Sequence, residues 1–361
     1  MRILIVKLGS IGDIVHTLPS LAAIRRALPR AEISWAVERG AAEILRDNPI
    51  LNRLIVVDTK VLRRWPVSGE TLLATRQQLR RLRASPFDLA IDFQGLLKSA
   101  IIALLSGAPR RFGFGRAHLR EPVSRFLLNG AVEVPTHTHI IRKNLALAAG
   151  ALQIAVPTDA REFEFPVQVS PEHEREAVDI AARSGERFAI LNPGGGWPTK
   201  LWDAGRFGAL ADALLLRHGL RSIVTYGPGE GELAERVARD SRTGAALAVS
   251  PTLKGFFALA RRASVYVGGD TGPTHLAVAA GAPVVGLFGP TEWWRNGSPR
   301  ASDICVERTD IGCRVDCHRR ACTQWVCMDI EVERVLSAVE ERLKESASKV
   351  LDAVEVNLSG A

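Results

Sequence analysis

The first 19 residues, MRILIVKLGSIGDIVHTLP (1–19), decide the fold prediction for the rest of the chain. The apolar, β-branched run at residues 3–6 is typical of a strand that is buried on both faces of a parallel sheet. A turn with two glycines follows at residues 7–12, and glycine lets backbone N–H groups approach a ligand closely. The apolar residues after Asp13 have helical spacing. The stretch therefore predicts a strand, a ligand-binding turn and a helix, which together open an α/β sheet.

Asp13 has two possible roles at this position. Ligands of open α/β sheets bind at the carboxyl ends of the strands, so a carboxylate there could act as a catalytic base. Aspartate is also a common residue at the start of a helix, where it accepts backbone hydrogen bonds. The residues alone leave both interpretations open.

Length and composition predict a globular protein of about two domains, at ~150 residues per domain. The chain has 361 residues, of which 47% are hydrophobic and 24% charged. No apolar run approaches the ~20 residues that span a bilayer. Because the N-terminus enters a predicted strand directly, we expect no signal peptide. All five cysteines lie between Cys305 and Cys327. An odd number of cysteines favours reduced thiols and a cytoplasmic location over a disulfide scaffold.

The positive charge is concentrated in the first half of the chain. Residues 1–157 hold 23 Lys and Arg against 11 Asp and Glu (+12), whereas residues 158–361 hold 24 against 28 (−4). A basic half predicts an anionic partner, which could be nucleic acid, a membrane surface or a substrate. Aromatic residues make up 6% of the chain, which is too few for a surface on which bases stack. We therefore expect no nucleic-acid partner.

The alternation of strands and helices predicts two doubly wound parallel α/β domains that face each other across a cleft. Residues 155–175 contain three prolines and no periodicity, which indicates a linker. We place the first domain at 1–157, the second at 158–340, and a helix end and tail at 341–361. Residues 110–120 are expected to form a loop rich in glycine and arginine.

Three glycine-rich loops in the second half follow predicted strands, at residues 192–200, 226–232 and 268–275. Backbone amides in such loops bind anions, although none of the three fits a Walker or G-x-G-x-x-G motif. Lys200 could neutralise the phosphates of a nucleotide diphosphate leaving group. Asp270 would repel phosphate, so we expect it to cap the helix that opens at Thr271 or to orient its amides. His275 could be a ligand or a core histidine.

The cysteine spacing does not favour a metal site. The five residues follow one another after seven, three, four and four intervening residues, with His318 nearby. Structural zinc usually shows two close cysteine pairs, so free thiols are the preferred interpretation and we expect no bound metal.

Together these motifs resemble glycosyltransferase family 9, the ADP-heptose:lipopolysaccharide heptosyltransferases. The resemblance spans about residues 1–340. It implies a GT-B fold, with the acceptor on the first domain and the nucleotide sugar on the second. The motifs that carry the resemblance are KLGSIGD (7–13), DFQGLLKS (92–99), REP (120–122), residues 197–202, GDTGPTHL (269–276) and FGPT (288–291).

The resemblance implies an inverting, metal-independent transfer of heptose from ADP-L-glycero-D-manno-heptose to the anionic lipopolysaccharide inner core. The enzyme would be cytoplasmic and peripheral at the inner face of the inner membrane. The REP motif resembles heptosyltransferase I, whereas the cysteine segment resembles heptosyltransferases II and III, so the heptose addition stays open. The alternatives are a family 9 transferase with another nucleotide sugar or acceptor, for O-antigen or glycoprotein, and a non-catalytic protein that binds anionic glycolipid.

The resemblance also assigns roles to individual residues. Asp13 would be the catalytic base and Lys200 would bind the donor phosphate. Glu230 would contact the ribose, although Glu232 is an alternative because the loop is one residue shorter than in the family. The donor set is Gly195, Gly196, Thr199, Lys200, Glu230, Asp270, Thr271, Gly272 and His275, and the acceptor set is Ser10, Gly12, Lys60, Arg63, Arg64, Gln94, Lys98, Arg120 and His139.

Overall fold

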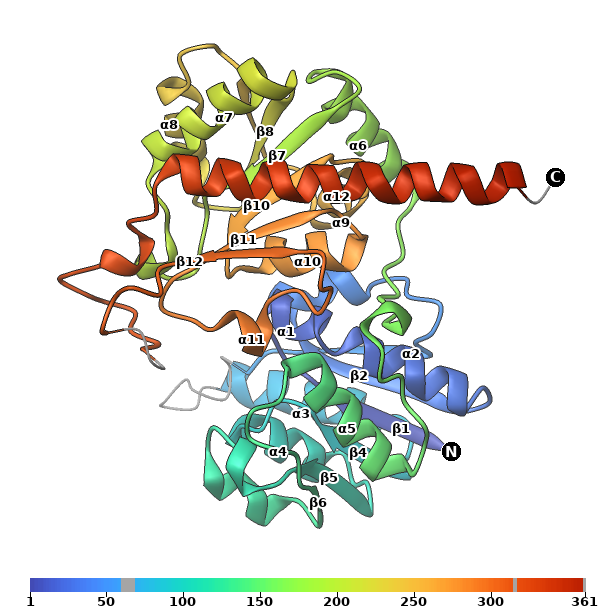
Figure 1. Ribbon diagram of the computed structural model, residues 1–361. Coiled ribbons are helices and arrows are strands. Elements are labelled where there is room, and N and C mark those ends of the chain that lie inside the picture. Colours follow the sequence, from blue (N-terminus) through green and yellow to red (C-terminus); the bar gives the residue numbers. More distant parts are fainter. Residues whose placement is uncertain (60–68, 314–316, 360–361) are drawn as a thin grey trace. The chain divides into compact units, whose positions relative to one another are not determined.

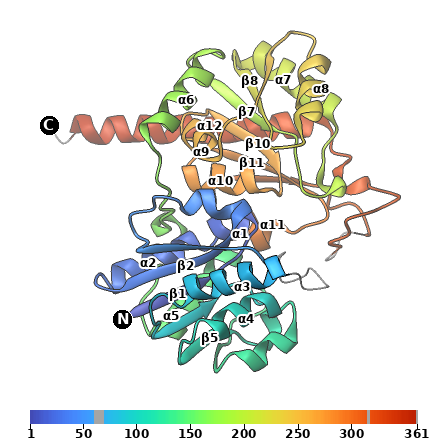
Figure 2. The same ribbon diagram turned by 180° about the vertical axis from the view of Figure 1, so that it is seen from behind.

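The chain folds into two compact units, Met1–Gln168 and Val169–Ala361 (Figures 1 and 2). The computed structural model describes residues 1–59, 69–313 and 317–359, with the side chains of 69–72, 74 and 347–359 excepted. Each unit contains a six-stranded sheet, and all the strand pairs are parallel. Helices connect successive strands. The prediction of two doubly wound α/β domains is therefore confirmed.

The first sheet is built around the strand formed by the opening residues. β1 pairs with β2 on one side and β4 on the other, so that Ile5 lies opposite both Trp35 and Ile91. The apolar residues of β1 are inaccessible to solvent, as expected for a strand in the middle of a covered sheet. The strand order is β3-β2-β1-β4-β5-β6, from β1 (Arg2–Val6), β2 (Glu32–Glu38), β3 (Arg53–Val57), β4 (Leu89–Asp92), β5 (Arg110–Phe114) and β6 (Gly130–Val132).

Helices cover both faces of the first sheet. Helices α2 and α5 pack against each other, whereas α3 and α4 lie on the opposite face, which Figure 2 shows. Leu82 at the end of α3 and Ala100 and Ala103 in α4 form one apolar core with Leu4 and Val6 of β1. The bounds are α1 (Ile11–Val15), α2 (Leu18–Ala27), α3 (Gly69–Leu82), α4 (Leu97–Leu105) and α5 (Ile140–Leu152), with 3₁₀ segments η1 (Arg39–Leu45), η3 (Arg116–His118), η4 (Pro122–Leu127) and η5 (Ala160–Glu162).

The prediction of a loop at residues 110–120 is wrong, because β5 occupies Arg110–Phe114 and pairs with β4. Gly113 was one reason to expect a loop. A Cβ atom at Gly113 would lie only 2.5 Å from a methyl carbon of Leu128, so the glycine lets the Leu128 side chain pack directly against the strand.

The boundary between the units lies after Gln168 and not at residue 157. Phe163 packs against Ala23, Ile141 and Leu145 of the first unit, and Glu164 forms an ion pair with Arg26. The predicted linker therefore contains a segment that belongs to the first unit. Residues 341–361, which we predicted to be a helix end and tail, belong to the second unit, and most of them continue its last helix, α12 (Val332–Ser359).

The second unit repeats this architecture with the strand order β12-β11-β10-β7-β8-β9. Trp202 and Phe207 pack edge to face in its core, and α12 covers the same core with Val335, Leu336 and Val339. No helix in the described part of the chain is long and apolar enough to cross a membrane. The bounds are β7 (Phe188–Asn192), β8 (Arg221–Thr225), β9 (Ala246–Val249), β10 (Val265–Gly269), β11 (Val284–Phe288), β12 (Ile304–Glu307), α6 (Pro171–Ala182), α7 (Ala204–His218), α8 (Gly231–Asp240), α9 (Leu253–Ala260), α10 (Gly272–Ala280), α11 (Trp293–Asn296), α12 (Val332–Ser359), η6 (Pro198–Lys200) and η7 (Val326–Met328).

Candidate functional site

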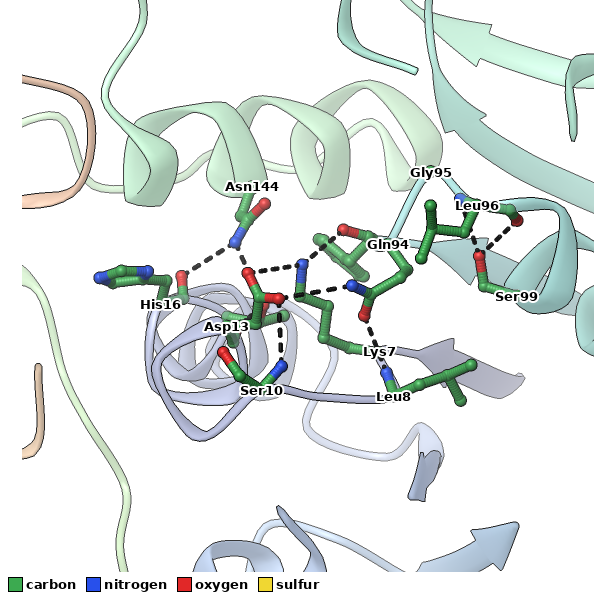
Figure 3. A network of polar contacts seen from close by, with 12 residues as sticks. Lys7, Leu8, Ser10, Asp13, His16, Gln94, Gly95, Leu96, Ser99 and Asn144 are labelled. Carbon is green, nitrogen blue, oxygen red and sulfur yellow. Dashed lines mark hydrogen bonds and ion pairs between the residues drawn. The ribbon is translucent and has the colours of Figure 1, made fainter. Parts of the chain in front are cut away.

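Asp13 lies in the short helix α1, just beyond the carboxyl end of β1 (Figure 3). Ser10 is the N-cap residue of α1, and its backbone N–H donates to Asp13 Oδ2 at 3.1 Å. Asp13 therefore stabilises the start of the helix, as one of the two interpretations predicted. Because 22% of its side chain is exposed, the same carboxylate can also reach a substrate.

Two further donors hold the Asp13 carboxylate. The Lys7 ammonium lies 3.5 Å from Oδ1 and donates to the Phe93 carbonyl oxygen at 2.9 Å. The Gln94 side-chain amide lies 3.4 Å from Oδ2, and its carbonyl oxygen accepts from the Leu8 backbone N–H at 3.0 Å. The side chain of Lys7 is only 4% exposed. A buried cation and an oriented amide thus fix the carboxylate in one position (Figure 3).

These neighbours determine the ionisation of Asp13. Burial by itself would raise the pKa of the carboxyl group, but the charges of Lys7 and Arg120 and the hydrogen bonds from Gln94 and Ser10 outweigh burial. The pKa of Asp13 is therefore lower than its ordinary value. The carboxylate is ionised at neutral pH and is able to accept a proton.

Asp92 supports this arrangement from below the surface. It is completely buried; its Oδ1 accepts from the backbone N–H groups of Gln94 (2.8 Å) and Gly95 (3.3 Å), and its Oδ2 accepts from the Ser99 hydroxyl (2.9 Å). Burial raises the pKa of Asp92 to about 6 in spite of these hydrogen bonds. The residue fixes the turn that carries Gln94, and sequence reasoning did not assign a role to it or to Lys7.

The other predicted acceptor residues of the first unit have varied environments. Arg120 is exposed, and its backbone N–H donates to the Gly95 carbonyl oxygen at 3.2 Å. Lys98 forms an ion pair with Glu38 at 2.7 Å. His139 is the N-cap residue of α5, and its ring lies edge to face with that of His16, with centroids 6.4 Å apart.

Two groups of predicted acceptor residues remain. Gly12 is buried in α1, where its carbonyl oxygen accepts from the His16 backbone N–H. The basic residues Lys60, Arg63 and Arg64 lie outside the described residues.

In the second unit, Lys200 and Asp270 form a nearly buried ion pair. Lys200 Nζ donates to Asp270 Oδ2 at 2.5 Å and to the Asp270 carbonyl oxygen at 3.1 Å. The other carboxylate oxygen, Oδ1, accepts from the Asn296 side chain and lies 3.3 Å from His275 Nε2. Burial would raise the pKa of Asp270, but His275 and Lys200 outweigh it and leave the pKa far below its usual range.

The expectation that Asp270 caps the following helix is wrong. The N-cap residue of α10 is Thr271, and Gly272 is the first helical residue. The hydrogen bonds found for the Asp270 carboxylate come from the side chains of Lys200, Asn296 and His275, and not from backbone amides of the helix. A nearby ammonium group is a stronger partner for a buried carboxylate than a neutral amide is. Asp270 therefore orients Lys200.

Glu230 joins two of the glycine-rich loops. Its carboxylate accepts from the backbone N–H groups of Gly195 (3.0 Å) and Gly227 (2.9 Å). A Cβ atom at Gly194 would lie close to Glu230 Oε2, so the glycine leaves room for the Glu230 carboxylate in this position. Glu232 is exposed on α8, and of the two glutamates Glu230 is the one that contacts the loops. Both amides are bound by a carboxylate from the chain itself.

The remaining donor residues divide into structural and accessible positions. Thr199 is buried; its hydroxyl donates to the Arg319 carbonyl oxygen at 2.7 Å, which favours a structural role. A side chain at Gly196 would meet open space, so this backbone is accessible. Sequence reasoning missed Arg320, whose guanidinium lies 5.0 Å from the ring centre of Trp197. The Lys200 ammonium lies 4.3 Å from the same ring centre. No local pattern could indicate this contact across more than a hundred residues.

The five cysteines are free thiols. Four of them, Cys313, Cys317, Cys322 and Cys327, border one small pocket together with Trp325. Among the residues that the structure describes, no three His, Cys, Asp or Glu side chains are arranged to hold a metal ion.

Known proteins resemble the chain in both sequence and structure. The model of glycosyltransferase family 9 (heptosyltransferase) matches residues 75–325. A lipopolysaccharide heptosyltransferase 1 from Pseudomonas aeruginosa is 31% identical over 90% of this chain and 88% of its own length. The Escherichia coli K12 protein of the same name is 30% identical over 81% of this chain and 89% of its own length. A solved E. coli heptosyltransferase, WaaC with ADP, is 25% identical, covers 95% of this chain and 100% of its own, and has a TM-score of 0.78.

Proposed function

Because this chain belongs to glycosyltransferase family 9, the heptosyltransferase family, we propose that it transfers heptose from ADP-L-glycero-D-manno-heptose to the lipopolysaccharide inner core. The reaction is a displacement that inverts the anomeric carbon. The observation that carries the proposal is the Asp13 carboxylate, which is ionised, partly exposed and fixed at the carboxyl end of β1.

Asp13 acts as the general base in this proposal. An acceptor hydroxyl attacks the anomeric carbon of the donor, the bond between that carbon and the ADP oxygen breaks, and Asp13 takes the hydroxyl proton. The positive charges of Lys7 and Arg120 keep Asp13 ionised before the reaction. Because the transition state is oxocarbenium-like, the attacking oxygen becomes acidic late, when even a base of low pKa can accept the proton.

The second unit binds the ADP part of the donor. The Lys200 ammonium has three N–H donors, of which two are directed at Asp270, and the third is able to bind a phosphate oxygen. The N-terminus of α10 adds partial positive charge at the end of β10. The Arg320 guanidinium contacts the Trp197 ring, as Lys200 does, and adds a second full positive charge.

We propose that these groups stabilise the leaving diphosphate without a metal ion. Lys200, Arg320 and the helix N-terminus supply positive charge where negative charge develops on ADP. Activity that persists in the presence of EDTA supports this assignment, and activity that EDTA abolishes and Mg²⁺ restores contradicts it.

For the acceptor, we propose the substrate of heptosyltransferase 1. Four relatives named heptosyltransferase 1 share 29–31% identity with this chain, whereas a heptosyltransferase 3 from E. coli shares 26% and a heptosyltransferase 1 from Campylobacter coli 23%. The acceptor is then an anionic, lipid-anchored precursor, and the enzyme works at the inner face of the inner membrane. The excess of positive charge in residues 1–157 supports such an acceptor.

The Asp13→Asn variant tests the central assignment. Asparagine keeps a carbonyl oxygen that can accept from Ser10 N–H, so the helix start is preserved while the base is lost. We expect the rate of ADP release with donor and acceptor to fall by about 10²–10⁴. Stabilisation of the variant by ADP against heat should equal that of the wild type. Near-normal turnover would reduce Asp13 to a helix cap.

The donor is tested in the same assay with a set of nucleotide sugars. Faster transfer from another nucleotide sugar than from ADP-heptose would overturn the donor assignment while leaving the base in place. Binding of the glycolipid without turnover of any sugar would favour the non-catalytic alternative.

A further inference from the structure

The first unit exposes large apolar side chains on two neighbouring segments, α4 and η4. Phe126 on η4 is 87% exposed and Val123 is 52% exposed. Leu104 and Leu105, in the last turn of α4, are 41% and 36% exposed. We call the outer surface of α4 and η4 the α4–η4 surface. Side chains of this size are seldom exposed together without a partner.

Contacts at both ends show that η4 runs beside α4 in the same direction. At the start, the Leu97 backbone N–H donates to the Glu121 carboxylate at 2.6 Å. At the end, the Arg111 guanidinium donates to the carbonyl oxygens of Ala108 (2.8 Å) and Leu127 (3.1 Å). The inner faces of both segments are buried in the core beneath them. The exposed side chains are therefore outward residues of one layer of the fold.

The chain around this surface is strongly basic. Residues 73–130 contain ten Lys and Arg against three Asp and Glu. One of the three acids, Asp92, is buried, and another, Glu121, is bonded to the start of α4. The exposed arginines of this region are Arg76, Arg80, Arg81, Arg83, Arg110, Arg116 and Arg120. Arg83 donates to the Leu105 carbonyl oxygen at 2.7 Å, and the exposed Arg120 lies two residues before η4, so cations border the exposed apolar side chains. Apolar side chains bordered by cations match an anionic lipid surface, which combines negative headgroups with an apolar interior.

The same surface adjoins the candidate base. Arg120 comes two residues before η4, and its backbone is bonded to Gly95, the neighbour of Gln94. Its charge contributes to the low pKa of Asp13. An acceptor whose lipid stays in the bilayer can reach Asp13 only if the bilayer lies near this part of the unit.

We propose that the α4–η4 surface docks on an anionic phospholipid bilayer, with Val123 and Phe126 entering the headgroup region and the surrounding arginines binding lipid phosphates. The proposal rests on the proposed function for its acceptor, because a lipid-anchored substrate requires an enzyme that approaches the membrane. It names the surface that does so. The arginines attract the protein to the membrane, and the two apolar side chains hold it there.

Sedimentation with vesicles tests the surface without requiring turnover. The full-length protein is mixed with vesicles of phosphatidylcholine alone or of phosphatidylcholine with phosphatidylglycerol. We expect binding to the anionic vesicles that weakens at high salt. Phe126→Asp should lower the partition coefficient at least about tenfold, which corresponds to ~1.4 kcal/mol. Val123→Asp should weaken binding as well.

Leu216→Asp is the matched control, since Leu216 is an apolar residue of α7 that is 75% exposed in the other unit. It should bind anionic vesicles as the wild type does. The proposal is overturned if Leu216→Asp loses as much vesicle binding as Phe126→Asp does. It is also overturned if Phe126→Asp binds the vesicles as well as the wild type, or if the wild type does not bind them. Wild-type binding that requires an added membrane protein would indicate a protein partner and overturn it too.

A second readout separates this proposal from the proposed function. Phe126→Asp should transfer sugar to a delipidated, soluble acceptor at the wild-type rate and should be slower only with acceptor in vesicles. If the wild type transfers no heptose to either acceptor, the proposed function fails, and the vesicle-binding results still decide the role of the surface.

Discussion

Replacing Asp92 by asparagine should stabilise the protein at neutral and alkaline pH. Asp92 is completely buried, and burial raises its pKa to about 6. Asparagine can keep the same hydrogen bonds: its oxygen accepts from the N–H groups of Gln94 and Gly95, and its amide donates to the Ser99 hydroxyl. That hydroxyl can in turn donate to the Leu96 carbonyl oxygen, 2.8 Å away. The substitution therefore removes a buried charge and leaves the hydrogen-bonded turn intact.

The magnitude follows from the pKa. Between pH 3.8 and 6, the folded state binds the Asp92 proton more tightly than the unfolded state does, so stability falls as pH rises through this range. The full loss is about 3 kcal/mol, from a shift of roughly two pKa units at 1.36 kcal/mol each. About half of this loss of stability has occurred by pH 5, so ~1.4 kcal/mol of stability remains to be lost between pH 5 and pH 8. Asp13 and Asp270 have lowered pKa values, so their contributions change only below about pH 4.

Urea denaturation at pH 5 and pH 8 measures this effect. The stability of Asp92→Asn relative to the wild type should rise by ~1.4 kcal/mol between the two pH values, with an unchanged denaturant slope. Asp88→Asn makes the same chemical change four residues earlier, at a surface position whose side chain is 49% exposed. A stability difference that is the same at pH 5 and pH 8, or that shrinks at pH 8, would refute the argument that Asp92 is a buried charge.

Two further substitutions test the environments of the reacting groups. Lys7→Met removes the positive charge that lies 3.5 Å from the Asp13 carboxylate, so the pKa of Asp13 should rise. The acid limb of the pH profile of kcat/KM should then move to higher pH. An acid limb that does not move would show that Lys7 only binds the Phe93 carbonyl oxygen. Lys200→Ala should raise the KM for the sugar donor and leave the KM for the acceptor unchanged, because Lys200 lies in the second unit. Steady-state kinetics with each substrate varied measure both constants, and a raised acceptor KM with an unchanged donor KM would contradict this placement.

Much of the fold could be predicted because its strands are plain apolar runs. The residues of β1 are apolar and β-branched, and they lie between β2 and β4 as such a run requires. The strand β5 could not be predicted in this way. Its sequence RRFGF has two exposed or half-buried arginines at one end, and its glycine reflects contact with Leu128, which is distant in sequence.

The site was predictable only where the pattern is local. Asp13 stands out because a carboxylate follows a buried strand and a glycine turn. Lys7 carries less signal, since a lysine at the end of a strand is usually exposed, and its burial depends on the Phe93 carbonyl that β4 brings beside it. Glu230 and Arg320 act through Gly195 and Trp197, and these pairings exist only in the folded chain.

Exposure, and not residue type, separates the roles of the three aspartates. All three are carboxylates near strand ends, and burial by itself would raise the pKa of each. Asp92 has no exposed surface and forms no ion pair with the residues that the structure describes, so it keeps a raised pKa and can only support the turn. Asp270 has a low pKa, but its side chain is 6% exposed and bonded to Lys200, so it orients that lysine. Asp13 alone of the three combines a low pKa with a side chain that is 22% exposed, and a base needs both properties to take a proton from a bound acceptor.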